Sequence, residues 1–216
     1  MAVTLHLVRH APAEGAAGRC IGQADLALAA DGGAAACAAL AARWTPPADA
    51  RLVASDLART RDTARALAAA WGHDAADVAL DARLREMHFG AWDGRAWDDV
   101  ERTDTAALGA WMARWHEVAV PGGEGFPDVL ARVAGWLGAW HASAPDGATG
   151  VVVAHAGSIR ALLCHALGLP LDAAFRLRVD HLRVSTLRLP APGSGDDAGH
   201  ACAARGELLL LNGAAP

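Results

Sequence analysis

The sequence predicts an α/β fold, a single domain with a mostly parallel central sheet and helices on both faces. Short apolar runs that suit strands alternate with longer Ala- and Leu-rich segments that suit helices. The run at residues 150–154 is apolar without interruption, which is typical of a parallel strand buried on both faces. No internal repeat or linker divides the 216 residues, so we expect one domain over residues 1–216.

Each expected element follows from a local pattern. Apolar and β-branched runs predict the strands, and Ala, Leu or Trp at helical spacing predicts the helices. Gly168 and Pro170 end the last helix, and the Pro-, Gly- and Asp-rich stretch at 190–206 predicts a mobile surface loop. In chain order we expect a strand at 4–8, a helix at 31–44, a strand at 51–54, a helix at 57–71, a strand at 78–80, helices at 103–117 and 126–141, a strand at 150–154, a helix at 158–167, and strands at 182–189 and 207–211.

The composition excludes several classes of protein. The net charge is −5, and a mildly acidic chain is unsuited to general nucleic-acid binding, which needs a basic surface. All 19 basic residues are Arg, so Schiff-base lysine chemistry and P-loop chemistry are excluded. No apolar stretch approaches the roughly 20 residues of a membrane helix, and the N-terminus does not resemble a signal peptide.

The four cysteines are scattered along the chain and form no CxxC pair. We expect neither a metal site nor a disulfide framework from them, and we expect a reducing, cytoplasmic location. Two of them lie in Ala- and Leu-rich stretches that predict buried helix faces, where a thiol packs as a small apolar group. The cysteines are Cys20, Cys37, Cys164 and Cys202, and the two in helical stretches are Cys37 and Cys164.

Polar side chains follow the expected strands at the points where active sites of open α/β sheets lie. The set consists of Arg9 and His10 after the first strand, Ser55, Asp56 and Arg59 after the second, Arg85 and Glu86 after the third, and His155 and Gly157 after the fourth.

These residue types suit a phosphate monoester. Two guanidinium groups bind phosphoryl oxygens through paired hydrogen bonds, and amides at the start of the helix beyond His155 favour an anion. A neutral imidazole can attack phosphorus, and a carboxyl group can protonate the departing oxygen. The fixed cations would stabilise the transition state, so we predict neither a metal nor another cofactor.

Five segments resemble the histidine phosphatase superfamily, which includes the phosphoglycerate mutases. They keep the order of the family's motifs between residues 4 and 168. The segments are Leu7-Val8-Arg9-His10-Ala11, the Ser55–Ala64 stretch SDLARTRDTA, the Leu84–Gly94 stretch LREMHFGAWDG, Pro121-Gly122-Gly123-Glu124 and His155-Ala156-Gly157-Ser158-Ile159-Arg160.

The resemblance implies a phosphoglycerate mutase-like fold and a role for each matched residue. His10 would be the nucleophile and Glu86 the general acid. The phosphoryl group would be held by Arg9, Arg59 and His155, and Gly22 and Gly157 would line the substrate site. Two positions depart from the family pattern, because Ala11 and Ala156 stand where glycine follows the two histidines. Alanine fits there only if the local φ is negative.

The chain length, the loop at residues 22–25 and the Gly-Gly-Glu element look most like α-ribazole 5′-phosphate phosphatase, an enzyme of cobalamin biosynthesis. The expected reaction is metal-independent hydrolysis of a small phosphorylated metabolite through a phosphohistidine, with an optimum at mildly acidic to neutral pH. The alternatives are a broad-specificity small-molecule phosphatase, a phosphoglycerate mutase-like phosphotransferase and an inactive binding protein. A monomer and a homodimer are both open.

Several neighbouring residues have less defined expected roles. Pairs of Trp residues four apart predict core positions, whereas two Trp residues near Glu86 are expected to border the pocket. We expect one His to pack beside Glu86, a second to lie near the pocket rim, and Glu124 to start a helix. The core pairs are Trp111 with Trp115 and Trp136 with Trp140, the pocket residues are Trp92 and Trp97, and the two histidines are His88 and His181.

Overall fold

The computed structural model describes residues 1–30, 33–191 and 205–216. Its six-stranded sheet has the order β3-β2-β4-β1-β5-β6, in which β1, β2, β3 and β4 run parallel. Strand β5 runs antiparallel to both of its neighbours, β1 and β6. The predicted α/β fold with a mostly parallel sheet is confirmed. The strands are β1 (Val3–Arg9), β2 (Arg51–Ala54), β3 (Ala79–Leu80), β4 (Thr149–Ala154), β5 (Val184–Leu189) and β6 (Glu207–Gly213).

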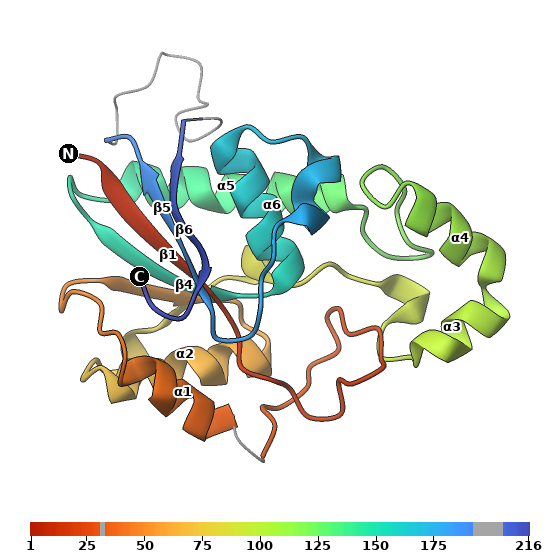
Figure 1. Cartoon of the computed structure of the whole chain (residues 1–216), viewed down its shortest axis with the longest axis horizontal. Coiled ribbons are helices and arrows are strands. Elements are labelled where there is room, and N and C mark those ends of the chain that lie inside the picture. The colour runs from red at the N-terminus through yellow and green to blue at the C-terminus, as the bar shows by residue number, and fades with distance from the viewer. Residues whose placement is uncertain (31–32, 192–204) are drawn as a thin grey trace.

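Helices cover both faces of the sheet (Figure 1). Helices α1 and α2 pack against each other on one face, and α5 and α6 pack against each other on the opposite face. The short helices α3 and α4 extend to one side of the sheet (Figure 1). The helices are α1 (Gly33–Ala41), α2 (Ala58–Ala70), α3 (Trp97–Thr103), α4 (Thr105–Ala113), α5 (Phe126–Ser143) and α6 (Ala156–Leu167).

Strand alternation divides the core into two layers. Leu5 and Leu7 of β1 belong to the apolar cluster that includes residues of α5 and α6, such as Leu162. Val8 of the same strand belongs to the second cluster, which includes Leu67 of α2. Successive side chains of a strand point to opposite faces, so the alternation in β1 feeds both layers.

The helix expected at 103–117 is a wrong prediction. The structure has two helices there, α3 and α4, separated by Asp104, which leaves the helical conformation at φ −127° and ψ 29°. The carboxylate of Asp104 accepts hydrogen bonds from Arg95 at 2.8 Å and from the Thr103 hydroxyl at 3.0 Å. Helix α4 also ends early, because Arg114 adopts φ −143° and ψ 42°. Trp115 therefore lies beyond the helix.

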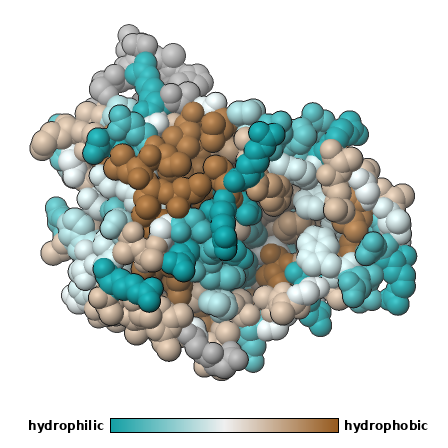
Figure 2. Space-filling model, in the orientation of Figure 1, coloured by the Kyte–Doolittle hydropathy of each residue, from teal (hydrophilic) through white to brown (hydrophobic). Residues whose placement is uncertain are grey.

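The remaining element predictions differ mainly at their ends, by a few residues. Most of the loop expected at 190–206 lies outside the described residues, as does Cys202. The predicted burial of Cys37 and Cys164 is confirmed. No described helix combines the length and the hydropathy that crossing a bilayer requires. Strand β6 is one of the two edge strands, its Leu209 is 49% exposed, and the apolar patch in Figure 2 lies over this strand.

Candidate active site

His10 follows β1 directly and is buried at the carboxyl end of that strand. Its backbone N–H donates to the Ala154 carbonyl of β4 at 3.0 Å, which extends the parallel pairing by one residue. Its Nδ1 lies 2.6 Å from the Ala11 carbonyl oxygen. A carbonyl can only accept, so Nδ1 carries the proton, and the lone pair of a neutral ring is then on Nε2. Burial, with a further contribution from the Arg59 charge, holds the pKa of His10 well below its usual value.

His155 follows β4 and lies behind His10, with the two ring centroids 5.1 Å apart. It is fully buried, and its Nε2 lies 3.1 Å from the Ser55 hydroxyl at the end of β2. Burial, and then the neighbouring His10, holds the pKa of His155 well below its usual value. Its Nδ1 is buried and has no hydrogen-bond partner among the described residues. Such an atom costs free energy unless a ligand satisfies it.

Two arginines flank His10. Arg9 donates from Nη1 to the Val179 carbonyl at 2.8 Å, and its buried Nε has no hydrogen-bond partner in the described chain. Arg59, on α2, is 1% exposed and donates to the carbonyls of Ala24 and Gly22 at 2.8 and 2.6 Å. Burial lowers the pKa of both guanidinium groups, and the nearby Glu86 carboxylate opposes that shift.

Glu86 reaches the same place from the segment after β3. Its two carboxylate oxygens accept hydrogen bonds from the Met87 N–H at 2.9 Å and from the Gly157 N–H of α6 at 3.1 Å. A Cβ atom on residue 157 would overlap the Glu86 carboxylate. Glycine at this position therefore lets the carboxylate approach the start of α6.

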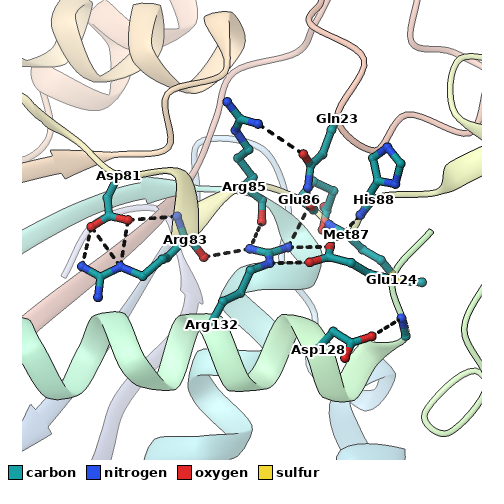
Figure 3. A network of polar contacts seen from close by, with 11 residues as sticks. Gln23, Asp81, Arg83, Arg85, Glu86, Met87, His88, Glu124, Asp128 and Arg132 are labelled. Carbon is teal, nitrogen blue, oxygen red and sulfur yellow. Dashed lines mark hydrogen bonds and ion pairs between the residues drawn. The ribbon is translucent and has the colours of Figure 1, made fainter. Parts of the chain in front are cut away.

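The backbone around Glu86 is held by Arg132 and Glu124 (Figure 3). Arg132, on α5, donates to the carbonyls of Arg83, Arg85 and Glu86 at 2.7, 2.6 and 3.0 Å. It also pairs with both oxygens of Glu124, at 2.8 and 3.0 Å. Glu124 in turn accepts from the backbone N–H of His88 at 2.8 Å. Glu124 does not start α5 as expected, because the helix begins at Phe126 after the N-cap Gly125; instead Glu124 ties Arg132 of that helix to the segment that carries Glu86.

These groups open into a cavity of about 480 Å³. We call one group of its lining residues the polar wall, namely Arg9, His10, Arg59, Glu86, Arg160 and His181. We call a second group the aromatic wall, namely Phe89, Trp97, Trp111, Trp115, Phe126 and Phe175. Rings of the aromatic wall contact one another, with centroids 4.3 Å apart for Trp115 and Phe175 and 5.8 Å apart for Phe89 and Trp111.

The structure brings the predicted site residues together, and all but His155 and Gly22 line the cavity. Arg9, His10, Arg59, Glu86 and Gly157 line the cavity. His155 lies beneath His10. Gly22 lies behind Arg59, where its carbonyl accepts from that guanidinium and its N–H donates to Asp93 at 2.9 Å. A Cβ on Gly22 would overlap the Met87 carbonyl, so this glycine serves loop packing.

The two alanine departures fit the backbone. Among the described residues other than glycine, only Leu182 and Asn212 have positive φ, so Ala11 and Ala156 carry no strain from their side chains. The Ala11 N–H donates to the Thr63 hydroxyl at 3.0 Å.

Some expectations about the surroundings need correction. Trp92 is fully buried in the core and does not border the cavity, whereas Trp97 does. Trp111 and Trp115 are half-buried and line the cavity, although their spacing predicted core positions. Trp111 lies on α4 and Trp115 beyond its end, so the two do not share the face of one helix on which the prediction rested.

Sequence reasoning missed Arg160 and Phe175. The Arg160 guanidinium lies over the Phe175 ring at 5.0 Å and donates to the Leu177 carbonyl at 3.0 Å. Arg160 is three residues after Gly157 on α6, and this spacing, which puts both on one helix face, was the available signal. His181, expected near the rim, donates to the His10 carbonyl at 2.7 Å.

Within the described ranges, no three His, Cys, Asp or Glu side chains are placed to hold a metal ion. The guanidinium groups in the cavity lining are those of Arg9, Arg19, Arg59 and Arg160.

Comparison with known proteins gives matches along most of the chain. A glucosyl-3-phosphoglycerate phosphatase of Mycolicibacterium vanbaalenii is 40% identical over 129 residues, which cover 56% of this chain and 55% of that protein, about half of its length. A probable phosphoglycerate mutase GpmB of Enterobacter sp. (strain 638) is 32% identical over 184 residues, which cover 85% of this chain and 83% of that one.

A solved structure from Escherichia coli K-12, provisionally named an α-ribazole-5′-P phosphatase, superimposes with a TM-score of 0.83 at 25% identity. The superposition covers 100% of this chain and 98% of that one. The family model named histidine phosphatase superfamily (branch 1) matches residues 5–194. The enzyme class predicted from the five motifs is thereby confirmed, and the chain belongs to the histidine phosphatase superfamily.

Proposed function

We propose that this chain hydrolyses phosphate monoesters through a phosphohistidine formed on Nε2 of His10. The observation that carries the proposal is the state of His10, which is buried, depressed in pKa and bonded through Nδ1 to a carbonyl. These contacts favour a neutral ring with its lone pair on Nε2, the form that attacks phosphorus.

Unpaired donors around His10 support an anionic ligand. Arg9 Nε and His155 Nδ1 are buried without partners in the described residues, and a phosphoryl group offers the oxygens they lack. The Ser55 hydroxyl accepts from the Leu57 N–H at 3.4 Å and has its hydrogen available for Nε2 of His155. In that arrangement Nδ1 of His155 is the protonated nitrogen, ready to donate to the ligand.

The reaction proceeds in two steps. In the first, Nε2 of His10 bonds to phosphorus, the ester P–O bond breaks, and Glu86 gives its proton to the departing oxygen. In the second, Glu86 takes a proton from water, whose oxygen bonds to phosphorus as the P–N bond breaks. Free phosphate leaves, and both residues return to their starting state. The guanidinium groups of Arg9 and Arg59 offset the charge on the phosphoryl oxygens in both steps.

The aromatic wall favours a flat, apolar leaving group. Six aromatic side chains face the space beside Glu86 and offer ring surfaces for stacking, which stabilises a pair by about 0.5–1.5 kcal/mol. We therefore propose α-ribazole 5′-phosphate, which carries an aromatic base, as the substrate, and cobalamin biosynthesis in the cytoplasm as the setting. The resemblance to a glucosyl-3-phosphoglycerate phosphatase supports, as the second candidate, a phosphatase that acts on other small phosphorylated metabolites.

The catalytic proposal is tested with p-nitrophenyl phosphate. We expect vanadate-sensitive turnover that EDTA leaves unchanged, and a loss of about four orders of magnitude or more in His10→Ala. When the phosphoryl group of the substrate carries ³²P, an acid-labile label should appear on the wild-type chain and not on this variant. His73→Ala, remote from the cavity, is the matched control and should retain activity. A His10→Ala enzyme with wild-type turnover would refute the proposal.

A substrate panel separates the candidate functions. We expect a higher kcat/KM for α-ribazole 5′-phosphate than for glucosyl-3-phosphoglycerate or 3-phosphoglycerate. The reverse order would favour the second candidate. Formation of 2-phosphoglycerate from 3-phosphoglycerate without free phosphate would favour the mutase.

The pH dependence follows from His10. Burial lowers its pKa, so the ring stays neutral to a more acidic pH than a free histidine, whose pKa is about 6.5. We expect the midpoint of the acidic limb of the kcat/KM profile to lie at a pH lower than 6.5. A rate that falls steadily from pH 9 to pH 5 would contradict this expectation.

A further inference from the structure

The segment that carries Glu86 has no regular structure of its own. It lies between two single-turn 3₁₀ helices, Ala82–Leu84 and Gly90–Trp92, so helix and strand hydrogen bonds do not fix its backbone. The position of the Glu86 carboxylate therefore depends on contacts with other parts of the chain. Figure 3 shows that these contacts come largely from α5 and the turn before it.

Arg132 supplies most of the contacts on one side of Glu86. Its guanidinium donates to three backbone carbonyls, those of Arg83, Arg85 and Glu86, and its remaining bonds go to Glu124. The Arg132 side chain is 17% exposed, so water competes little for these bonds. A planar guanidinium offers five N–H donors in a fixed arrangement, whereas an ammonium group is a compact charge that cannot span three carbonyls in this way.

Glu124 completes the arrangement on the other side of Glu86. Its carboxylate accepts from the His88 N–H at 2.8 Å, and its own N–H donates to the His88 carbonyl at 2.8 Å. The same carboxylate orients Arg132. The backbone is thus held both before and after Glu86, while the hydrogen bonds of the Glu86 side chain to the described residues come from the Met87 and Gly157 amides.

We propose that Arg132 is a positioning residue that, paired with Glu124, holds Glu86 where it can protonate the leaving oxygen. This inference rests on the proposed function, in which Glu86 is the proton donor. Displacing a reacting group by about 1 Å can cost about 10²-fold in rate. Arg132 makes no hydrogen bond to Arg9, Arg59 or His155, and its charge is a minor cause of the lowered pKa of His155, so its loss should affect protonation far more than anion binding.

The test compares two esters that need protonation to different extents. p-Nitrophenolate leaves readily without a proton, whereas an alkoxide from an alkyl phosphate needs one. We expect Arg132→Met to lower kcat/KM about 10²-fold for the alkyl ester and less than about 5-fold for p-nitrophenyl phosphate, because kcat/KM reports the transfer to His10 and not the later hydrolysis that both esters share. Its affinity for vanadate should stay within about 3-fold of wild type, since the phosphoryl site is intact.

Arg83→Met is the matched control. Arg83 lies in the same segment and has its own ion pair, with Asp81 at 2.6 Å, but it makes no bond to Glu86 or Glu124 (Figure 3). Its removal should leave the ratio of the kcat/KM values for the two esters unchanged. Arg132→Lys, which keeps the charge opposite Glu124, is the second variant if Arg132→Met does not fold, and it should shift the ratio in the same direction.

Glu86→Gln separates the inference from the function on which it rests. If Glu86→Gln discriminates between the two esters and the Arg132 variants slow both esters equally, Arg132 has only a general structural role and the inference is overturned. If Glu86→Gln itself does not discriminate, the proton-donor role is wrong and the inference falls with it. Ester discrimination in both Glu86→Gln and the Arg132 variants supports the proposal.

Discussion

The polar wall and the aromatic wall of the cavity are held by different kinds of contact. In the polar wall, His10 is bonded to the Ala11 carbonyl just after β1, Arg59 to carbonyls of the loop at residues 22–24, and Glu86 to an amide at the start of α6. In the aromatic wall, rings contribute mainly edge-to-face contacts, and Phe175 is 53% exposed. Directional bonds fix the first set of groups, whereas the second can repack around a ligand.

This difference separates the chemistry from the choice of substrate. Strand ends converge because the sheet places them together, and the groups that would act on a phosphoryl unit are found there. Four residues of the aromatic wall come from α3, α4, the start of α5 and the 3₁₀ helix Leu171–Arg176, which lie outside the sheet, whereas Trp115 follows α4 and Phe89 lies in the segment that carries Glu86. Changes in those elements would alter the leaving group that is accepted without altering the phosphoryl site.

Among the changes that test this contrast between the two walls, the largest effect is expected at Gly157, which lies against the Glu86 carboxylate. Gly157→Ala should displace the Glu86 carboxylate and lower kcat for an alkyl phosphate about 10²-fold, because the new methyl group overlaps that carboxylate. Gly135→Ala on α5, where a Cβ meets no atom within 4 Å, is the matched control. Equal kcat values for the two variants would show that Glu86 tolerates displacement, which would break the contrast between a fixed and an adaptable wall.

A second prediction separates the acid sensitivity of the fold from that of the site. His6 lies on β1 outside the cavity, bonded to the Thr186 hydroxyl at 3.0 Å and packed against Trp44, and burial lowers its pKa to about 4. The unfolded chain therefore binds this proton first as the pH falls. The contribution of neutral His6 to the free energy of unfolding is complete above pH 6.5 and is lost progressively between pH 6.5 and about pH 4.

His6→Asn should remove this part of the pH dependence, about 2–3 kcal/mol of the free energy of unfolding between pH 7 and pH 4.5. Urea unfolding at both pH values measures it. His10 and His155 also have lowered pKa values, so the variant should keep part of the wild-type acid sensitivity. A pH dependence identical to that of wild type would assign all of the sensitivity to other groups.

The smallest effect is expected in the aromatic wall. Trp115→Ala removes ring contacts at 4.3 Å to Phe175 and 5.1 Å to Phe126, and should raise KM for an aromatic ester about 2- to 10-fold. The kcat for a small alkyl phosphate should change less than about 2-fold. Met112→Ala, at an exposed position of α4, is the control. A loss of kcat for both esters would mean that the aromatic wall supports catalysis itself.

The polar wall was predictable because its motif residues lie at the end of a strand or in the short segment that follows one. Arg9, His10 and His155 could be placed together because the carboxyl ends of parallel strands lie at the same end of the sheet. Strands β1 and β4 are indeed neighbours. The aromatic wall was not predictable in this way. The break at Asp104 depends on Arg95, nine residues away, and it redirects the chain that carries Trp111 and Trp115.

The sequence by itself determined the α/β fold, the family and four residues of the polar wall, Arg9, His10, Arg59 and Glu86. Hydrophobic periodicity and local motifs carry that information, because regular elements repeat their pattern. Only the tertiary structure decided that Trp92 is core, that Arg160 enters the cavity and that Arg132 reaches the backbone of Glu86, 46 residues away. A hydrogen bond between one side chain and a distant, irregular stretch of backbone produces no periodic pattern in the sequence, so periodicity cannot predict it.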